Sequence, residues 1–177
     1  WRAGRLSSSS LATMTAAKSA GADVVLARSR FTADMPALFQ RYARIPDRDS
    51  LDYACAEPLS ELARTGIERF NQGAYYPAHD ALEEAWMQDD GPGRDLYRGI
   101  LQVGIAYYQI EQGNYRGAVK MLLRVRQWLS PLPDTCRGVD VRTLREDVDH
   151  AHAALVSLGP ERIVDFDRSF FKPIRFA

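Results

Sequence analysis

The stretch FNQGAYYPAHDALEEAW holds the side chains of this sequence whose types and spacing could do chemistry. His79, Glu83 and Trp86 follow one another at steps of four and three residues, so on a helix they share one face within an arc of about 60°. Glu83 favours protonation of the His79 imidazole, whereas the positive end of the helix dipole opposes it. An imidazole held in this way could act as a general base, a metal ligand or a hydrogen-bond donor. Asp80 and Glu84 lie about 100° further round the helix and are expected to face solvent.

A second polar pair lies in an apolar helical segment further along the chain. In RGILQVGIAYYQI, Gln102 lies in the middle of the apolar run and follows Arg98 by four residues, so the two side chains project from one side. A buried amide without a partner costs about 1–3 kcal/mol, and across an antiparallel hairpin the available partners are His79 and Glu83. We therefore expect His79, Glu83, Arg98 and Gln102 to form one polar cluster. Trp86 walls it, and periodicity leaves open which tyrosines join: Tyr75, Tyr107 or Tyr108.

Three interpretations of this cluster stay open. The leading one is a pocket that binds a small ligand or a protein segment. The second is a hydrolase in which His79 and Glu83 are the catalytic residues or hold a divalent metal. A stable zinc site needs three or four protein ligands, however, and His150 and His152 point apart, so at most one of them could join. The third is a purely structural cluster that fixes helix register. Whether the protein is an enzyme, and which cofactor it would use, stays open.

No other motif marks catalytic chemistry. The sequence has no glycine-rich phosphate loop, no dinucleotide fingerprint and no serine or cysteine nucleophile in a recognisable motif.

The elements that position these residues are all helical. Apolar residues recur at helical spacing, and no segment alternates with period two for long enough to be a strand. The sequence predicts an all-α fold, a compact bundle of about five antiparallel helices. We expect the helices to run from Pro58 to the stop at Gly73, from about Pro77 to Met87, from about Arg94 to Gln112, from about Tyr115 to Leu129, and from a cap at Asp140 through Leu155.

A Gln-Gly-x-Tyr pattern occurs twice, in NQGAY and EQGNY, at an offset of 40 residues. Each copy is expected to mark a helix end, a tight turn and the start of the next helix. The bundle would then be built from two stacked helical hairpins, since two copies are too few for a solenoid.

Composition narrows the class of partner. The 177 residues suit one domain with a sizeable core, and the hydrophobic fraction of 46% is ordinary for a soluble globular protein. The 23 basic and 23 acidic residues balance, so nucleic acid is not an expected partner. No apolar run reaches the roughly 18 residues of a membrane span. A basic stripe follows one helix face and would be either solvated or a docking surface for an acidic partner such as a second copy of the chain: Arg116, Lys120, Arg124 and Arg126.

The two cysteines indicate the redox environment. Cys55 and Cys136 are too few for a disulfide framework and lack metal-site spacing, so we expect a reducing compartment.

The two ends of the chain differ from its middle. Residues 1–22 are rich in Ser and Ala and contain Arg and Lys but no acid, which is typical of an organelle transit peptide, such as a chloroplast one. The alternative is an unstructured leader with Met14 as the true start, in which case the protein would be cytoplasmic.

Residues 23–57 are expected to be an irregular extension, with a short helix from about Pro36 to Arg44 and a linker at PDRDS. The helical domain would span 58–158. The tail, 159–177, is apolar and basic at SFFKPIRF, and either packs back on the bundle or holds a partner.

Several separated motifs resemble one known family. AHDALEEAW, YRGILQVGIAYYQIEQGNYRGAVKML and RGVDVRTL are similar to the small all-helical family called domain of unknown function 309, over about residues 60–157. Its H-x-x-x-E-x-x-W/Y motif is matched by His79, Glu83 and Trp86, with Asp80 in the place where Glu often follows the histidine. Its G-x-x-Q segment, Gly-Asn-x-x-Gly-Ala turn and Gly-x-Asp loop are matched by Gly99, Gln102, Gly113, Asn114, Gly117, Ala118, Gly138 and Asp140. The resemblance implies a helical fold and a shared site. A metal role has been suggested for the motif, and the family has no established activity.

Overall fold

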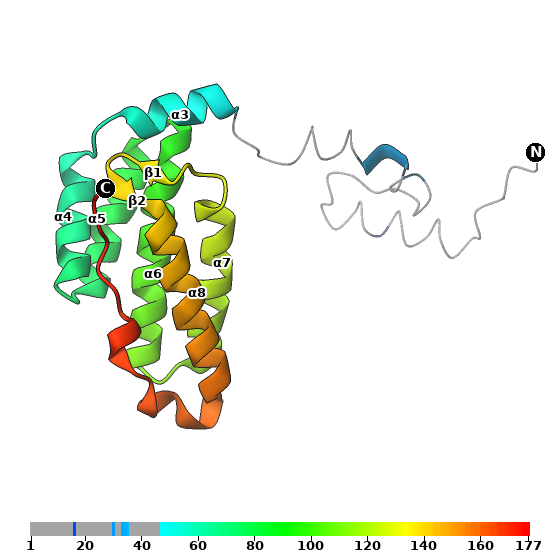
Figure 1. Cartoon of the computed structure of the whole chain (residues 1–177), viewed down its shortest axis with the longest axis vertical. Coiled ribbons are helices and arrows are strands. Elements are labelled where there is room, and N and C mark those ends of the chain that lie inside the picture. The colour runs from blue at the N-terminus through cyan, green and yellow to red at the C-terminus, as the bar shows by residue number, and fades with distance from the viewer. Residues whose placement is uncertain (1–15, 17–29, 31–32, 36–46) are drawn as a thin grey trace, which may run out of the picture. The chain divides into compact units, whose positions relative to one another are not determined.

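The computed structural model describes residues 47–177 without a break, together with 16, 30 and 33–35 (Figure 1). The chain divides into two compact units, Trp1–Ile45 and Pro46–Ala177. The helix expected from about Pro36 to Arg44 lies outside the described residues, as does nearly all of the leader. Every element below belongs to the second unit.

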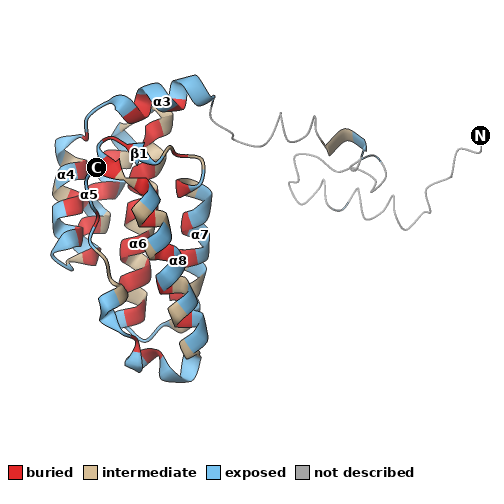
Figure 2. Ribbon diagram, in the orientation of Figure 1, coloured by how far each residue is buried: buried red, intermediate tan, exposed pale blue. Residues whose placement is uncertain are grey.

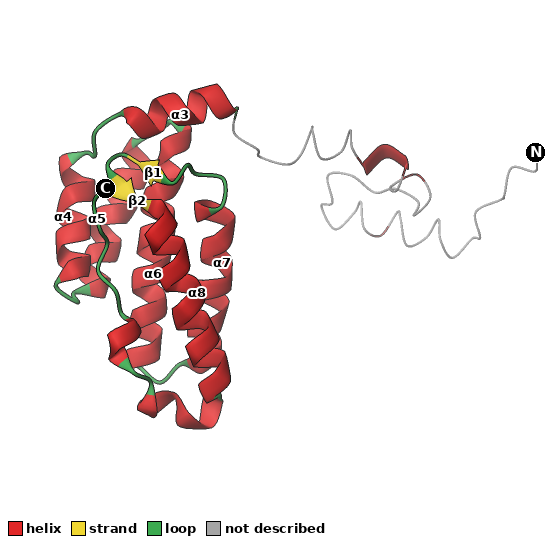
Figure 3. Ribbon diagram, in the orientation of Figure 1, coloured by secondary structure: helices red, strands yellow, loops and turns green. Residues whose placement is uncertain are grey.

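This unit is a helical bundle, which confirms the predicted fold class (Figure 3). Each long helix packs against the next one in the chain, so α4 and α5 form one hairpin and α6 and α7 form a second beside it. The helices are α3 Arg48–Ala56, α4 Glu61–Asn71, α5 Tyr75–Gln88, α6 Asp95–Glu111, α7 Tyr115–Leu129 and α8 Val141–Leu158, with 3-10 turns η1 Pro92–Arg94, η2 Pro160–Asp165 and η3 Arg168–Phe170. Two short antiparallel strands, β1 Thr135–Cys136 and β2 Val139–Asp140, precede α8, and they are too short to produce an alternating pattern.

Local capping explains where the helices start. Helix α7 has the predicted bounds, because Asn114 accepts the N–H of Gly117 at its start. Helix α4 begins at Glu61 and not at Pro58, because Ser60 Oγ accepts the N–H of Ala63 at 3.2 Å.

The repeated Gln-Gly-x-Tyr pattern has the predicted role. Helices α4 and α6 end one residue before the glutamine of each copy, and Gly73 and Gly113 follow at φ values of 78° and 71°. Glycine adopts this left-handed conformation at little cost, which allows the sharp reversal into α5 and α7.

Helix α3 corrects the prediction of a linker at PDRDS. Asp47 caps it by accepting the N–H of Ser50 at 3.0 Å, and its buried side chains include Leu51 and Cys55. Cys55 forms a disulfide with Cys136 of β1, a residue 81 positions away. The expectation of a reducing compartment rested on the small number of cysteines, and it did not foresee this bond, which joins two residues that only the fold brings together.

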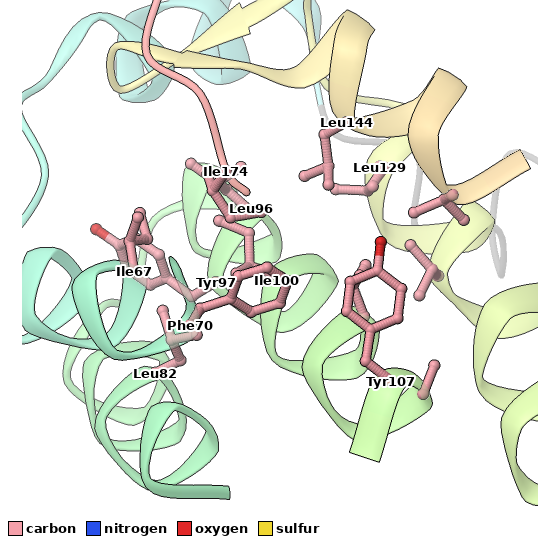
Figure 4. Close-up of a cluster of buried hydrophobic side chains, with 14 of the residues drawn as sticks. Ile67, Phe70, Leu82, Leu96, Tyr97, Ile100, Tyr107, Leu129, Leu144 and Ile174 are labelled. Carbon is pink, nitrogen blue, oxygen red and sulfur yellow. The ribbon is translucent and has the colours of Figure 1, made fainter. Parts of the chain in front are cut away.

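The core runs through all the long helices and includes the tail (Figures 2 and 4). Phe166 and Ile174 are buried, and the Asn71 side chain accepts the N–H of Ile174 at 2.7 Å and donates to its carbonyl at 3.0 Å. Phe176 forms a bridge with Val139. Of the two expectations for the tail, packing on the bundle is the one realised. No helix in the described part of the chain is long and apolar enough to cross a membrane.

Candidate functional site

A cavity of about 270 Å³ lies where α5, α6 and α7 meet. Its lining contains all five of the ligand-binding residues proposed from the sequence, together with three apolar side chains: His79, Glu83, Trp86, Arg98, Leu101, Gln102, Ile105 and Met121. The period of the two helices explains this convergence. Arg98, Leu101, Gln102 and Ile105 are spaced at i, i+3, i+4 and i+7, so they form one stripe of α6 that faces the stripe of α5.

Arg98 is held by two indole rings. Its Cζ lies 4.8 Å from the centre of the Trp86 ring and 3.9 Å from that of Trp128 on α7. Such cation–π contacts contribute about 0.5–2 kcal/mol each. No carboxylate of the described residues forms an ion pair with Arg98.

Gly99 brings Trp128 within reach of Arg98. A Cβ at Gly99 would collide with the Cδ2 and Cγ atoms of Leu129, so only glycine allows α6 and α7 to approach this closely. Trp128 was not among the residues predicted for the site, although the glycine of the G-x-x-Q segment indicated a close helix contact.

The polar side chains do not pair across the cavity as expected. His79 Nδ1 lies 3.3 Å from Asp80 Oδ1 and makes no hydrogen bond to Glu83, and the Tyr76 ring stacks against the imidazole at 6.2 Å. Gln102 does not meet His79 or Glu83, and its Oε1 is buried without a hydrogen-bond partner among the described residues. The predicted hydrogen-bonded seam was wrong, because these side chains line a cavity and form no hydrogen bonds with one another.

Trp86 Nε1 is also buried without a hydrogen-bond partner in the described structure. Trp86 Nε1 and Gln102 Oε1 are thus a donor and an acceptor, on two residues that line the cavity, without a hydrogen-bond partner among the described residues. Buried polar groups normally find a partner. The described residues contain five other such atoms, and one of them is Nε1 of Trp128, the second ring that contacts Arg98.

None of the three tyrosines that periodicity left open lines the cavity. Tyr75 and Tyr107 belong to an aromatic cluster with Phe70 and Phe171, and burial raises the pKa of Tyr75 to about 12 and raises that of Tyr107 as well. Tyr108 contacts Tyr76 at 6.0 Å and so adjoins the site only indirectly.

The donor set does not fit a protein-held metal ion. Across residues 47–177 and the few described before them, no three His, Cys, Asp or Glu side chains are grouped so that they could hold one. His150 and His152 lie on α8 and do not line the cavity. His79 and Glu83 therefore remain two ligands where three or four are needed.

A second polar cluster, which was not predicted from the sequence, surrounds Arg137. This residue is only 8% exposed; its Nη2 lies 2.7 Å from Asp89 Oδ2, its Nη1 donates to the Tyr97 hydroxyl, and its backbone N–H donates to the Cys55 carbonyl at 2.6 Å. It joins α3, the loop after α5, α6 and the hairpin beside the disulfide. Arg137 and Tyr97 each begin one of the segments that resemble the family, but their distance in sequence gave no indication that they meet.

The fold and the cavity thus define a small helical-bundle protein with a polar site between its two hairpins. Residues 63–121 match the family model of the domain of unknown function DUF309, which confirms the resemblance found in the motifs. All the cavity residues lie in this range, whereas Trp128 lies beyond it.

An uncharacterized protein of Aquifex aeolicus (strain VF5) is 26% identical over 87 residues, which are 49% of this chain. The match spans about a quarter, 26%, of that protein's own length.

Proposed function

We propose that the cavity between α5, α6 and α7 binds a small polar ligand, and that the protein acts through this binding. The observation that carries the proposal is the Arg98 guanidinium, which lines the cavity between two indole rings and has no carboxylate partner among the residues described.

The chemistry of a guanidinium supports an anionic group on the ligand. Its N–H donors lie in the plane of the group, and the two indole rings beside it offer no acceptor for them, since an indole only donates. A planar fork of donors matches a carboxylate or a phosphate in bidentate fashion. The surrounding rings also lower the local dielectric, which strengthens the interaction with an anion.

The size of the cavity supports a small molecule over a protein segment. Pockets for drug-sized ligands have volumes of about 300–1,000 Å³, and this one has about 270 Å³. The alternative of a metal-dependent hydrolase has only His79 and Glu83 as ligands and gains no support from the geometry.

Thermal unfolding in the presence of a panel of anionic, zwitterionic and neutral metabolites tests the proposal. A ligand that binds the folded state raises the melting temperature, since it stabilises by RT ln(1 + [L]/Kd). We expect at least one small anionic or zwitterionic compound to do so, and the increase to disappear in Arg98→Met.

The matched control is Arg94→Met, because Arg94 also lies over the Trp86 ring, at 5.1 Å, but does not line the cavity. Each variant is compared with its own ligand-free melting temperature. The proposal is wrong if no compound stabilises the protein, or if stabilisation is the same in Arg98→Met.

A further inference from the structure

The cavity carries two opposite charges that do not pair with each other. Glu83 and Arg98 both line it, yet their nitrogen and oxygen atoms are not within the 4.0 Å of an ion pair. Neither one pairs with any other charged side chain in the described part of the chain. A ligand that carries both charges can contact each partner at once.

The two buried polar atoms without a hydrogen-bond partner also favour a ligand that carries both charges. Gln102 Oε1 needs a donor, and Trp86 Nε1 needs an acceptor. An ammonium group can donate to the glutamine, and a carboxylate can accept from the indole as well as from Arg98. A ligand that carries both a hydrogen-bond donor and an acceptor could therefore pair with both residues.

The charges of Glu83 and Arg98 disfavour other classes of ligand. A phosphate or a dicarboxylate would bring a second negative charge toward Glu83, and a simple amine would face Arg98 without a compensating charge. The remaining wall is apolar, formed by Leu101, Ile105 and Met121. Methionine adapts its shape to neighbouring groups, so this wall suits an aliphatic side chain of moderate size.

We propose that the ligand is a free α-amino acid with an apolar side chain, bound through its carboxylate at Arg98 and through its ammonium at Glu83 and Gln102. This inference rests on the proposed function and names the substrate class of the same cavity. The aliphatic side chain lies against Leu101, Ile105 and Met121.

Isothermal titration of the full chain with L-leucine and matched analogues tests the assignment. The analogues are 4-methylpentanoate, which lacks the ammonium, 3-methylbutylamine, which lacks the carboxylate, and N-acetyl-L-leucine, which resembles the carboxyl end of a peptide. We expect L-leucine to bind and each analogue to bind at least about tenfold more weakly, because each leaves one charged side chain without its partner.

Two variants assign each charge to its partner. Glu83→Gln should weaken L-leucine about tenfold or more and leave 4-methylpentanoate unchanged, whereas Arg98→Met should weaken L-leucine and leave 3-methylbutylamine unchanged. Glu84→Gln is the control, because Glu83 and Glu84 are both exposed but only Glu83 lines the cavity. We expect it to bind L-leucine as the unchanged protein does.

Equal binding of L-leucine and 4-methylpentanoate would overturn the assignment, since Glu83 would then contact no ammonium. Equal binding of N-acetyl-L-leucine would indicate a peptide end in place of a free amino acid. If other metabolites stabilise the protein through Arg98 while L-leucine does not bind, the ligand class is wrong and the binding site remains. If nothing binds in either experiment, both proposals fail.

Discussion

The guanidinium of Arg98 on α6 lies over the Trp128 ring of α7, with its Cζ 3.9 Å from the ring centre. The contact joins the two helices of the second hairpin and sets the direction in which the guanidinium presents its donors. Because Trp128 lies outside the residues that match the family model, the orientation of a matched residue depends on a part of the chain beyond the match.

A double-mutant cycle measures this contact. We expect Arg98→Met and Trp128→Leu to show a coupling of about 0.5–2 kcal/mol in the free energy of unfolding, since each variant alone removes the same cation–π interaction. Denaturant unfolding of the four proteins gives the value. As a control, Arg98→Met combined with Leu123→Ala, an exposed position on α7, should be additive within about 0.3–0.5 kcal/mol. A coupling no larger than that of the control would show that the stacking contributes nothing.

The disulfide is expected to stabilise the fold substantially. Cys55 and Cys136 are 81 residues apart, and a cross-link over a loop of this length restricts the unfolded chain strongly. Reduction should lower the free energy of unfolding by about 2–4 kcal/mol, as measured by denaturant titration with and without a thiol reductant. The double variant Cys55→Ala/Cys136→Ala should not respond to the reductant, because the chain contains no other cysteine. A reductant effect of the same size in that variant would contradict the assignment.

Removal of Arg137 should be costly. Arg137→Met leaves the partly buried carboxylate of Asp89 without its cation and the Tyr97 hydroxyl without its donor, so we expect a loss of about 3–5 kcal/mol in the free energy of unfolding. Arg142→Met, at an exposed position on α8, should change it by no more than about 0.5 kcal/mol. Similar values for the two variants would mean that the Arg137 cluster does not stabilise the fold.

Stability should also depend on the protonation of His152. Burial lowers the pKa of this imidazole below its usual value, and the positive charge of Arg126 lowers it further. The unfolded chain therefore takes up the proton first as the pH falls, and the free energy of unfolding should decrease below about pH 6.5. Urea unfolding between about pH 7.5 and pH 5.5 measures this decrease.

His152→Gln should remove that part of the pH dependence, whereas His150→Gln, at an exposed position on the same helix, should retain it. If His152→Gln keeps the full dependence, another group is responsible.

The helices that were predicted well are those whose ends are fixed by neighbouring residues. Asn114 and Ser130-Pro131 bound α7 locally, so both ends followed from the sequence. Helix α3 was missed because its apolar face becomes meaningful only against the hairpin to which Cys55 is bonded. A contact across 81 residues has no counterpart in a local pattern.

The candidate site was likewise predicted only in part from the sequence. Helical period places His79 and Glu83 on one face of α5 and Arg98 and Gln102 on one face of α6, and a short connection makes the two helices antiparallel. Whether facing side chains meet or leave a space between them depends on rotamers and on helix separation. The helical periodicity of a sequence determines neither the rotamers nor the helix separation. The hydrogen bonds expected from it were therefore not found.

The two copies of the Gln-Gly-x-Tyr turn provide an internal comparison. At the same offset of 40 residues, the positions of His79, Glu83 and Trp86 in α5 correspond to Val119, Leu123 and Arg126 in α7. The second hairpin has the same turn and the same sequence of helices, yet it carries none of the three side chains of the motif. A hairpin of this protein therefore folds without these three side chains. Their presence in α5 alone makes its wall of the cavity different from the wall that α6 and α7 form.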